Sequence, residues 1–129
     1  MGRLSAVLDA WALVAFMRDE AAAERVEKVV IGGDAVASSV NLGEALYTEM
    51  RRRGDAPALR AVDWLSRRVT VDEPDWPLTV AAARLKVHNW ISYAGAFAVA
   101  TAQKRRLPLW TGDPEIIALT GQVAVVDLR

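Results

Sequence analysis

Short apolar segments alternate with helical segments along the whole chain of 129 residues. Each apolar segment is only a few residues long, which is typical of a strand buried on both faces rather than of a helix. The expected strands are Ser5–Leu8, Ala35–Ala37, Val69–Val71, Leu109–Thr111 and Val123–Val126. Strands of this kind that alternate with helices predict a mostly parallel sheet with helices on both of its faces.

Helical patterns fill the segments between these strands. Gly54 is suited to end one helix, Pro77 to the first turn of another, and Ser92 to cap a third. The expected helices are Ala10–Arg18, Ala21–Val30, Asn41–Arg53, Ala58–Arg67, Pro77–Val87, Tyr93–Arg106 and Pro114–Leu119. The fold class that this order predicts is α/β: a three-layer α/β/α sandwich with a mostly parallel central sheet, formed by residues 1–129 as a single domain.

The composition limits the chemistry that the chain can perform. There is no cysteine and only one histidine, His88, which excludes a thiolate zinc site and a site with several histidines. A bound metal would therefore be held by oxygen ligands, which favours Mg²⁺ or Mn²⁺. No apolar run approaches the roughly 20 residues of a membrane span. We therefore expect a soluble protein of the cytoplasm, with no membrane partner.

Basic residues are clustered, although their total does not predict a nucleic-acid partner. The sixteen Lys and Arg residues balance sixteen Asp and Glu residues, so the formal net charge is zero. The clusters are Arg51–Arg53, Arg67–Arg68 and Lys104–Arg106. Each cluster suits the last turn of a helix, where cations interact favourably with free carbonyl groups, and each could instead contact phosphate.

Three carboxylates stand just beyond expected strands. Asp9 ends the first strand, Glu44 follows the second, and Asp113 follows the fourth. In a parallel sheet, ligands bind outside the carboxyl ends of the strands, so the three side chains can converge at one edge. Like charges brought that close repel one another unless a cation lies among them. The pattern favours a divalent-metal site.

Helix capping is the competing interpretation of the same residues. Asp9 precedes an expected helix, Asn41 and Glu44 match a capping-box pattern, and Asp113 precedes Pro114 at a first helical position. Capping explains each residue separately and requires no particular topology. A metal site requires all three carboxylates at one edge of the sheet.

Four segments together resemble the VapC-type toxin ribonucleases of the PIN-domain family: VLDAW, SSVNLGEAL, SYAGAFAVATA and LPLWTGDPEI. The family's aspartate after the first strand is matched by Asp9, its glutamate by Glu44, and its aspartate after the fourth strand by Asp113. Thr111 matches the hydroxyl of the family's T-x-D motif. The family also has an aspartate in the first turn of the helix after S-Y-x, and that position here is Gly95.

The resemblance implies a function for the chain. It implies a metal-dependent endoribonuclease toxin of a type II toxin–antitoxin system, in which carboxylates hold Mg²⁺ or Mn²⁺ and RNA phosphodiester bonds are hydrolysed. It implies a cognate antitoxin protein as partner, transfer or ribosomal RNA as substrate, and a homodimer. The catalytic and metal-binding residues are then Asp9, Glu44 and Asp113, with Thr111 and Asn41 in support.

Gly95 departs from the family pattern and is an unfavourable residue in the first turn of a helix. Glycine inside a helix is about 1 kcal/mol less favourable than alanine, whereas an aspartate in the first turn interacts favourably with the helix dipole. The glycine is consistent with an inactivated variant of a nuclease or with a natural degenerate member that only binds. We expect activity to be reduced or abolished. The alternative function is a non-catalytic PIN-like module that binds RNA or protein.

The sequence does not decide where several aromatic residues lie in the structure. Trp11 could pack in the core or lie at the rim of the site and stack on a base, and Tyr93 and Trp110 carry the same ambiguity. The remaining tryptophans could lie in the core, in a dimer interface or in an antitoxin groove: Trp64, Trp76 and Trp90. The first two helices and the helix of Leu46 are further candidates for the antitoxin surface.

Overall fold

Five parallel strands form the centre of the molecule. The computed structural model describes residues 3–129. The strands are β1 (Ala6–Leu8), β2 (Ala35–Ser38), β3 (Thr70–Asp72), β4 (Leu109–Thr111) and β5 (Val125–Asp127), arranged in the order β3-β2-β1-β4-β5. All four neighbouring pairs are parallel. The expected parallel sheet is confirmed, and each strand lies within a few residues of its expected position.

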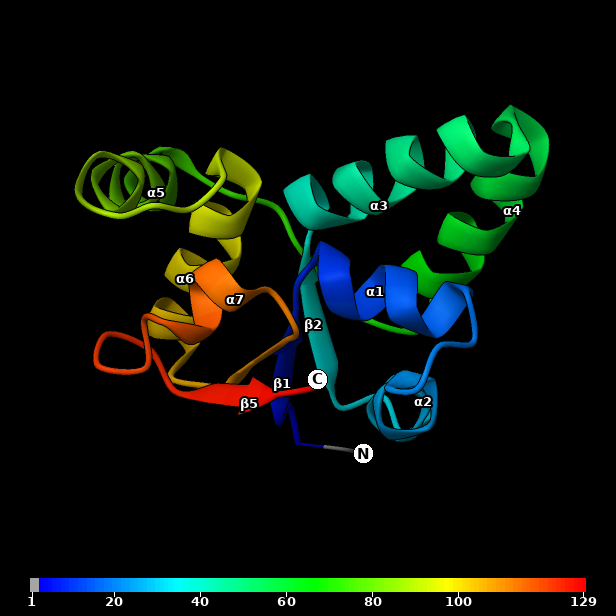
Figure 1. Cartoon of the computed structure of the whole chain (residues 1–129), viewed down its shortest axis with the longest axis horizontal. Helices are drawn as coiled ribbons and strands as arrows, with labels where there is room; N and C mark the ends of the chain where they lie inside the picture. Colours follow the sequence, from blue (N-terminus) through cyan, green and yellow to red (C-terminus); the bar gives the residue numbers. More distant parts are fainter. Residues whose placement is uncertain (1–2) are drawn as a thin grey trace.

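Helices cover both faces of this sheet (Figure 1). On one face lie α1 (Ala10–Met17), α2 (Ala23–Ile31), α3 (Ser39–Arg53) and α4 (Asp55–Ser66). On the other face lie α5 (Trp76–His88), α6 (Tyr93–Arg105) and α7 (Pro114–Ile117). The three-layer α/β/α sandwich expected from the sequence is therefore confirmed. Within residues 3–129, no helix is long and apolar enough to cross a membrane.

Alternate strand residues serve two separate cores. Ala6 and Leu8 of β1 pack with α1 to α4, whereas Val7 packs with α5 to α7. This division follows from the strand period of two residues, which sends neighbouring side chains to opposite faces. Both faces are apolar because both are covered. The continuous apolar runs in the sequence have this origin.

The first turn of α3 differs from the sequence-based expectation. The helix begins at Ser39, and Ser38 is its N-cap because its Oγ accepts a hydrogen bond from the Val40 N–H at 3.2 Å. Asn41 and Glu44 therefore lie inside the helix, and the capping-box interpretation of this pair is wrong. The Asn41 side chain is buried and instead donates to the Ala94 carbonyl oxygen at 2.9 Å, which links α3 to the start of α6.

The order of the strands reverses direction at β1. From β1 the chain moves to β2 and β3 on one side, then returns to place β4 and β5 on the other side. The register pairs Leu8 with Trp110, so the residues that follow β1 and β4 emerge side by side. Ligands of open α/β sheets bind outside the carboxyl ends of the strands at such a reversal. The topology therefore directs attention to Asp9 and Thr111.

Candidate functional site

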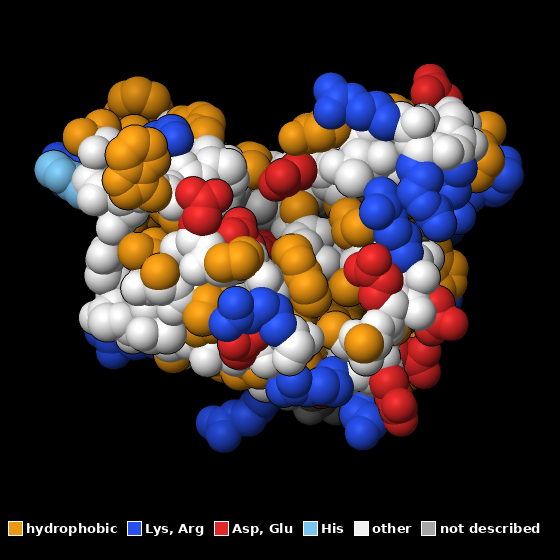
Figure 2. Space-filling model, in the orientation of Figure 1, with side chains coloured by type: hydrophobic (Ala, Val, Ile, Leu, Met, Phe, Trp, Pro, Cys, Tyr) orange, Lys and Arg blue, Asp and Glu red, His pale blue; other side chains and the backbone are white. Residues whose placement is uncertain are grey.

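A hollow of about 360 Å³ opens at the carboxyl edge of the sheet, where β1 and β4 end. Figure 2 shows this face notched between the α3 side and the α5–α6 side, with acidic side chains gathered around the notch. The lining comes from α1, α3, the start of α6 and the β4–α7 turn. It consists of Asp9, Ala10, Trp11, Val14, Arg18, Glu20, Asn41, Glu44, Thr48, Ser92, Gly95, Asp113 and Ile116. The three carboxylates predicted from the sequence thus line one hollow.

Asp9 is buried at the centre of this arrangement. Its Oδ1 accepts a hydrogen bond from the Ala12 N–H at 3.0 Å, and its Oδ2 accepts a hydrogen bond from the Thr111 hydroxyl. The Thr111 Oγ1 in turn accepts from the Asp113 N–H at 3.0 Å. A chain of hydrogen bonds therefore joins the ends of β1 and β4 and fixes the orientation of the Asp9 carboxylate.

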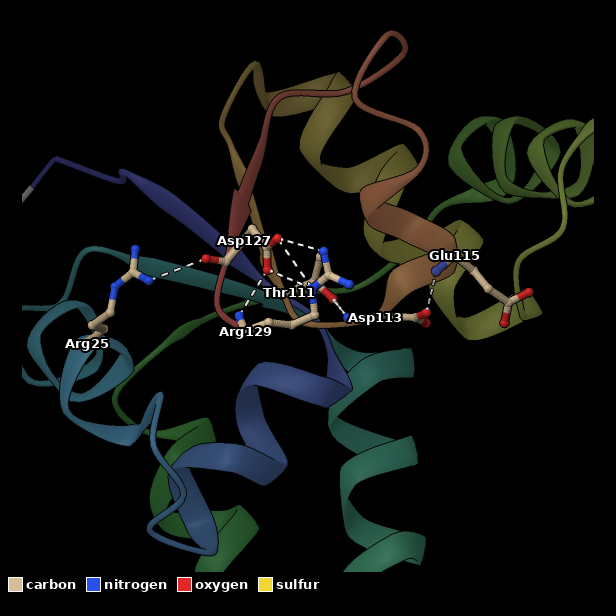
Figure 3. A network of polar contacts seen from close by, with 6 residues as sticks. All are labelled: Arg25, Thr111, Asp113, Glu115, Asp127 and Arg129. Atoms are coloured by element: carbon tan, nitrogen blue, oxygen red, sulfur yellow. Dashed lines mark hydrogen bonds and ion pairs between the residues drawn. The ribbon is translucent and has the colours of Figure 1, made fainter.

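Asp113 begins α7 and faces the same hollow. Its Oδ1 accepts from the Glu115 N–H at 2.9 Å, and Pro114 occupies the first helical position (Figure 3). Asp9 caps α1 in the same way. The capping interpretation and the placement at one edge are both correct, because each aspartate caps a helix that begins at the rim of the hollow. Glu44 caps nothing and makes no hydrogen bond or ion pair within residues 3–129.

Burial and mutual repulsion perturb two of the three carboxylates. Burial raises the pKa of Asp9 to about 7, the Thr111 and Ala12 hydrogen bonds oppose the rise, and the charges of Asp113 and Glu44 add to it. The pKa of Glu44 is raised by burial and by the charge of Asp113. Such clustered shifts are typical of functional sites, and a cation placed among the carboxylates would relieve them.

The oxygen ligands fit a hard divalent cation, but too few of them lie close enough together to form a complete coordination shell. The three side chains offer carboxylate oxygens, the ligands that Mg²⁺ and Mn²⁺ prefer. Within the described part of the chain, however, no three acidic or histidine side chains gather closely enough to hold an ion. Asp9, Glu44 and Asp113 would therefore have to draw together around a metal, or a further ligand would be needed.

Gly95 lies at the rim of the hollow, in the first turn of α6. Its N–H donates to the Ser92 Oγ at 2.9 Å, so Ser92 caps the helix as expected. A Cβ atom at this position would lie 3.0 Å from the Ser92 Oγ and 3.4 Å from the Ile116 Cδ1. A side chain can be accommodated if the Ser92 Oγ shifts by a few tenths of an ångström, since the distance to Ile116 is an ordinary van der Waals contact. No backbone conformation requires glycine here, because Gly95 has no positive φ.

Arg18 lines the hollow but was not identified as a site residue in the sequence analysis. It ends α1, and Trp11 and Val14 precede it at helical spacing on the same face. That spacing was visible in the sequence and would have placed Arg18 beside the other two residues. Trp11 itself packs partly against the core and also lines the hollow, while its stacking on a base stays a prediction.

Gly112 permits the close approach of Trp11 to the T-G-D turn. A Cβ atom on Gly112 would lie 2.2 Å from the Trp11 Cζ2, far inside the contact distance of two carbon atoms. Replacing Gly112 with alanine would therefore force the rigid indole ring or the turn to move. We predict that Gly112→Ala lowers the free energy of unfolding by about 1–3 kcal/mol, measured by urea denaturation.

Two variants control this measurement. Gly43→Ala changes an exposed glycine inside α3 with open space around it, and should stabilise the protein by up to about 1 kcal/mol. In a Trp11→Ala background the indole is absent, so adding Gly112→Ala should cost much less. Equal costs of Gly112→Ala in both backgrounds would show that the contact with Trp11 is not the cause.

The raised pKa of Asp9 predicts a pH-dependent stability. Between about pH 4 and pH 7 the folded state retains a proton that the unfolded state has lost, so the free energy of unfolding falls as the pH rises through this range. Asp9→Asn should remove a loss of about 3 kcal/mol between pH 5 and pH 8. Thermal or urea melts at both pH values measure it, with exposed Asp19→Asn as the control. Parallel pH profiles of parent and Asp9→Asn would contradict the assignment.

Comparison with known proteins agrees with this geometry. A model of the PIN domain matches residues 6–121. No curated protein matches the sequence significantly. The fold is shared with the Sarcin-Ricin loop cleaving toxin VapC20 of Mycobacterium tuberculosis, at 20% identity and a TM-score of 0.73, over 89% of this chain and 95% of that chain.

Two further structures share the fold over nearly the whole chain. DNA-bound VapBC from Salmonella typhimurium has 15% identity and a TM-score of 0.78, over 98% of this chain and 99% of that chain. VapBC-1 from nontypeable Haemophilus influenzae has 18% identity and a TM-score of 0.73, over 97% and 98%. Because the family match spans most of the sequence and the folds agree, the chain belongs to the PIN-domain family.

Proposed function

We propose that this chain is a metal-dependent endoribonuclease toxin of a type II toxin–antitoxin pair, a single PIN domain over residues 1–129, with activity impaired by Gly95. The observation that carries the proposal is the convergence of Asp9, Glu44 and Asp113 on one hollow at the reversal of the sheet. The fold shared with an RNA-cleaving toxin and with VapBC complexes supports it.

Asp9, Glu44 and Asp113 would hold Mg²⁺ or Mn²⁺ in this proposal. When bound, the metal supplies an activated water and stabilises negative charge that builds on the phosphate. Asp9 must then be ionised at neutral pH, and a nearby cation lowers the pKa that burial has raised. Thr111 holds the Asp9 carboxylate in one orientation through its hydroxyl. Such fixed orientation is what a reactive site requires of its ligands.

Asn41 has a supporting role away from the reacting atoms. Its amide donates to the Ala94 carbonyl oxygen and so fixes the start of α6 against α3. Its Oδ1 accepts no hydrogen bond within the described residues, although it is buried. We assign to Asn41 the positioning of Glu44 on α3 relative to residue 95 on α6.

Gly95 leaves the acidic site one ligand short. The position lies in the first turn of α6, and a carboxylate there would extend from the rim of the hollow that the other three side chains line. The open ligand set of the present site also supports the alternative function, a non-catalytic PIN-like module that binds RNA or protein. The two functions differ in what restoring the carboxylate does.

Gly95→Asp should restore metal binding and cleavage. We expect Mn²⁺ to bind at least tenfold more tightly than to the parent, which corresponds to about 1.4 kcal/mol or more. The readouts are the rise in melting temperature with Mn²⁺ or Mg²⁺ and the cleavage of transfer or ribosomal RNA. Gly95→Asn is the matched control, since it has nearly the same size and no charge.

The outcomes separate the two functions. Cleavage by Gly95→Asp that disappears when Asp9→Asn is added supports the nuclease. A folded Gly95→Asp protein that cuts no RNA in Mn²⁺ or Mg²⁺ rejects the nuclease and favours the binding module.

Two apolar surfaces support the partners that we propose, an antitoxin and a second copy of the chain in the cytoplasm. On α5, Trp76 is 75% exposed and Val87 is 77% exposed, and both line a shallow apolar hollow of about 340 Å³. Between α1 and α4, a second hollow of about 310 Å³ is lined by Phe16, Met17, Arg53, Ala61, Trp64 and Leu65. Exposed aromatic and aliphatic patches of this kind mark protein interfaces. We assign the α5 surface to the homodimer and the α1–α4 hollow to the antitoxin.

Val87→Glu should convert the proposed dimer into a monomer, which halves the molar mass measured in solution. A carboxylate at Val87, in the lining of the α5 hollow, would be desolvated without a partner in a dimer, so light scattering after size exclusion should give a monomer. Ile31→Glu is the control, since Ile31 is 62% exposed at the end of α2. A monomeric parent, or a dimeric Val87→Glu protein, would contradict the assignment of this surface.

A further inference from the structure

A fully buried carboxylate on α3 is surrounded by three arginines. Glu49 is 0% exposed. Its Oε1 accepts from the Arg18 Nε at 2.7 Å, and its Oε2 lies 3.2 Å from the Arg53 Nε and 3.4 Å from an Arg52 Nη. Burying a charge is costly unless it is paired and hydrogen-bonded, so one arginine on Glu49 is expected. Three arginines are more than the pairing of one buried carboxylate requires. We refer to Arg18, Arg52 and Arg53 as the arginine triad.

The triad carries an excess of positive charge towards solvent. One carboxylate neutralises one guanidinium, which leaves two positive charges among three side chains. These side chains are 28%, 46% and 35% exposed for Arg18, Arg52 and Arg53. Each guanidinium has five N–H donors, and the contacts with Glu49 use only a few of them. The remaining donors of Arg18 and Arg53 make no hydrogen bond within residues 3–129.

In the other two basic clusters, no fully buried carboxylate joins several arginines within residues 3–129. Arg67 pairs with Asp63 at 2.8 Å, and Arg68 stacks on the Trp64 ring at 3.8 Å. In the third cluster, Arg105 pairs with Asp72 at 2.8 Å and Lys104 lies 3.9 Å from Asp75. In these two clusters an acid or an aromatic ring contacts every basic side chain except Arg106, which makes no ion pair within residues 3–129. In Figure 2, basic side chains gather over the end of α3, beside the notch.

The triad is connected to the acidic hollow. Arg18 lines the same hollow as Asp9 and Glu44. Asp9 is the N-cap and Arg18 the C-cap of α1, which places their Cα atoms roughly 13 Å apart at 1.5 Å per residue. The hollow therefore runs from Asp9 to Arg18, with Glu20 also in its lining. Arg52 and Arg53 lie outside this lining and are joined to Arg18 through Glu49. A strand a few nucleotides long spans this distance.

We propose that the arginine triad is a phosphate-binding site for an RNA strand that continues from the acidic hollow, with Glu49 as the positioning residue that orients the guanidinium groups. The proposal rests on the proposed ribonuclease function. Planar guanidinium groups bind phosphate oxygens in paired hydrogen bonds, and a side chain already fixed by Glu49 loses little freedom when it does so. Arg18 would contact the phosphate nearest the acidic end. Arg53 also lines the α1–α4 hollow that we assign to the antitoxin, so RNA and antitoxin would compete for this side chain.

An acidic protein segment is less compatible with the same hollow. Its carboxylates would have to approach Asp9 and Glu44 at the other end, where the acidic side chains already repel one another. An RNA strand also carries uncharged bases and sugars, which can lie over the acidic end while phosphates contact the triad. The arrangement therefore favours RNA as the occupant.

The test measures RNA binding without cleavage. A fluorescent oligouridylate of about 12 nucleotides, long enough for a single-strand site, is titrated with the full chain in EDTA at low salt, and its anisotropy is followed. Arg18→Ala and Arg53→Ala should each weaken binding about fivefold or more. Each should lower the slope of log affinity against log salt by about 0.7, as expected for the loss of one phosphate contact on a single strand. Lys104→Ala, at the far end of α6, is the charge-matched control and should change affinity less than twofold.

Glu49→Gln separates positioning from simple charge. The variant makes the surface more positive, so binding should tighten if only net charge matters. It should weaken if Glu49 orients the guanidinium groups, as we propose. Because a change at this buried residue can prevent folding, Arg18→Lys is measured in parallel. Arg18→Lys keeps the positive charge but loses the planar guanidinium group, and should weaken RNA binding nearly as much as Arg18→Ala.

Three results would overturn the proposal. They are equal effects of Arg18→Ala and Lys104→Ala, tighter binding by folded Glu49→Gln, or unchanged RNA binding by Arg18→Ala together with weaker binding of the antitoxin. The last result would assign the triad to an acidic protein partner. None of these readouts depends on metal or cleavage. RNA cleavage by Gly95→Asp with no effect of the triad variants would therefore reject the phosphate site alone and leave the proposed function standing.

Discussion

The hydrogen bond between the Asp9 carboxylate and the Thr111 hydroxyl joins the two strands on which the candidate site depends. It crosses from β1 to β4, the point where the order of the strands reverses. The second oxygen of Asp9 caps α1, and the Asp113 N–H donates a hydrogen bond to the Thr111 hydroxyl oxygen. The start of α1 and the start of α7 are thereby held at one edge. Every other group in the hollow is placed relative to this edge.

Stability and function draw on the same side chains here. Asp9 and Asp113 each cap a helix, which contributes about 1 kcal/mol, and each also presents oxygen to the hollow. Burial opposes this benefit for Asp9, because it raises the pKa of the carboxyl group to about 7. A cation placed among these carboxylates would remove both the repulsion and the cost of ionisation.

Charge is distributed along the hollow rather than over the whole molecule. The formal net charge is zero, yet Asp9, Glu44 and Asp113 line the hollow that also reaches Arg18, the member of the arginine triad on α1. Screening restricts exposed charges to a range of roughly 8 Å at physiological salt, so local arrangement decides which ligand is attracted. Glu49 is central to that arrangement because it gathers arginines from α1 and from the last turn of α3 around one buried carboxylate.

From the amino-acid sequence alone we predicted the α/β class, the parallel sheet, most element positions, and the placement of Asp9, Glu44 and Asp113 at one edge, where they line one hollow. These features follow from short-range patterns: apolar strands, helical periodicity and strand ends that meet in a parallel sheet. It also identified Gly95 through the resemblance. The folded structure was needed to show that Ser38 rather than Asn41 caps α3, that Trp11 packs on Gly112, and that Arg18 pairs with Glu49. The last two contacts join residues far apart in the chain, and the Asn41 amide is drawn from the cap to the Ala94 carbonyl in the same way. Local propensity cannot specify such partners, because packing of separate helices brings them together.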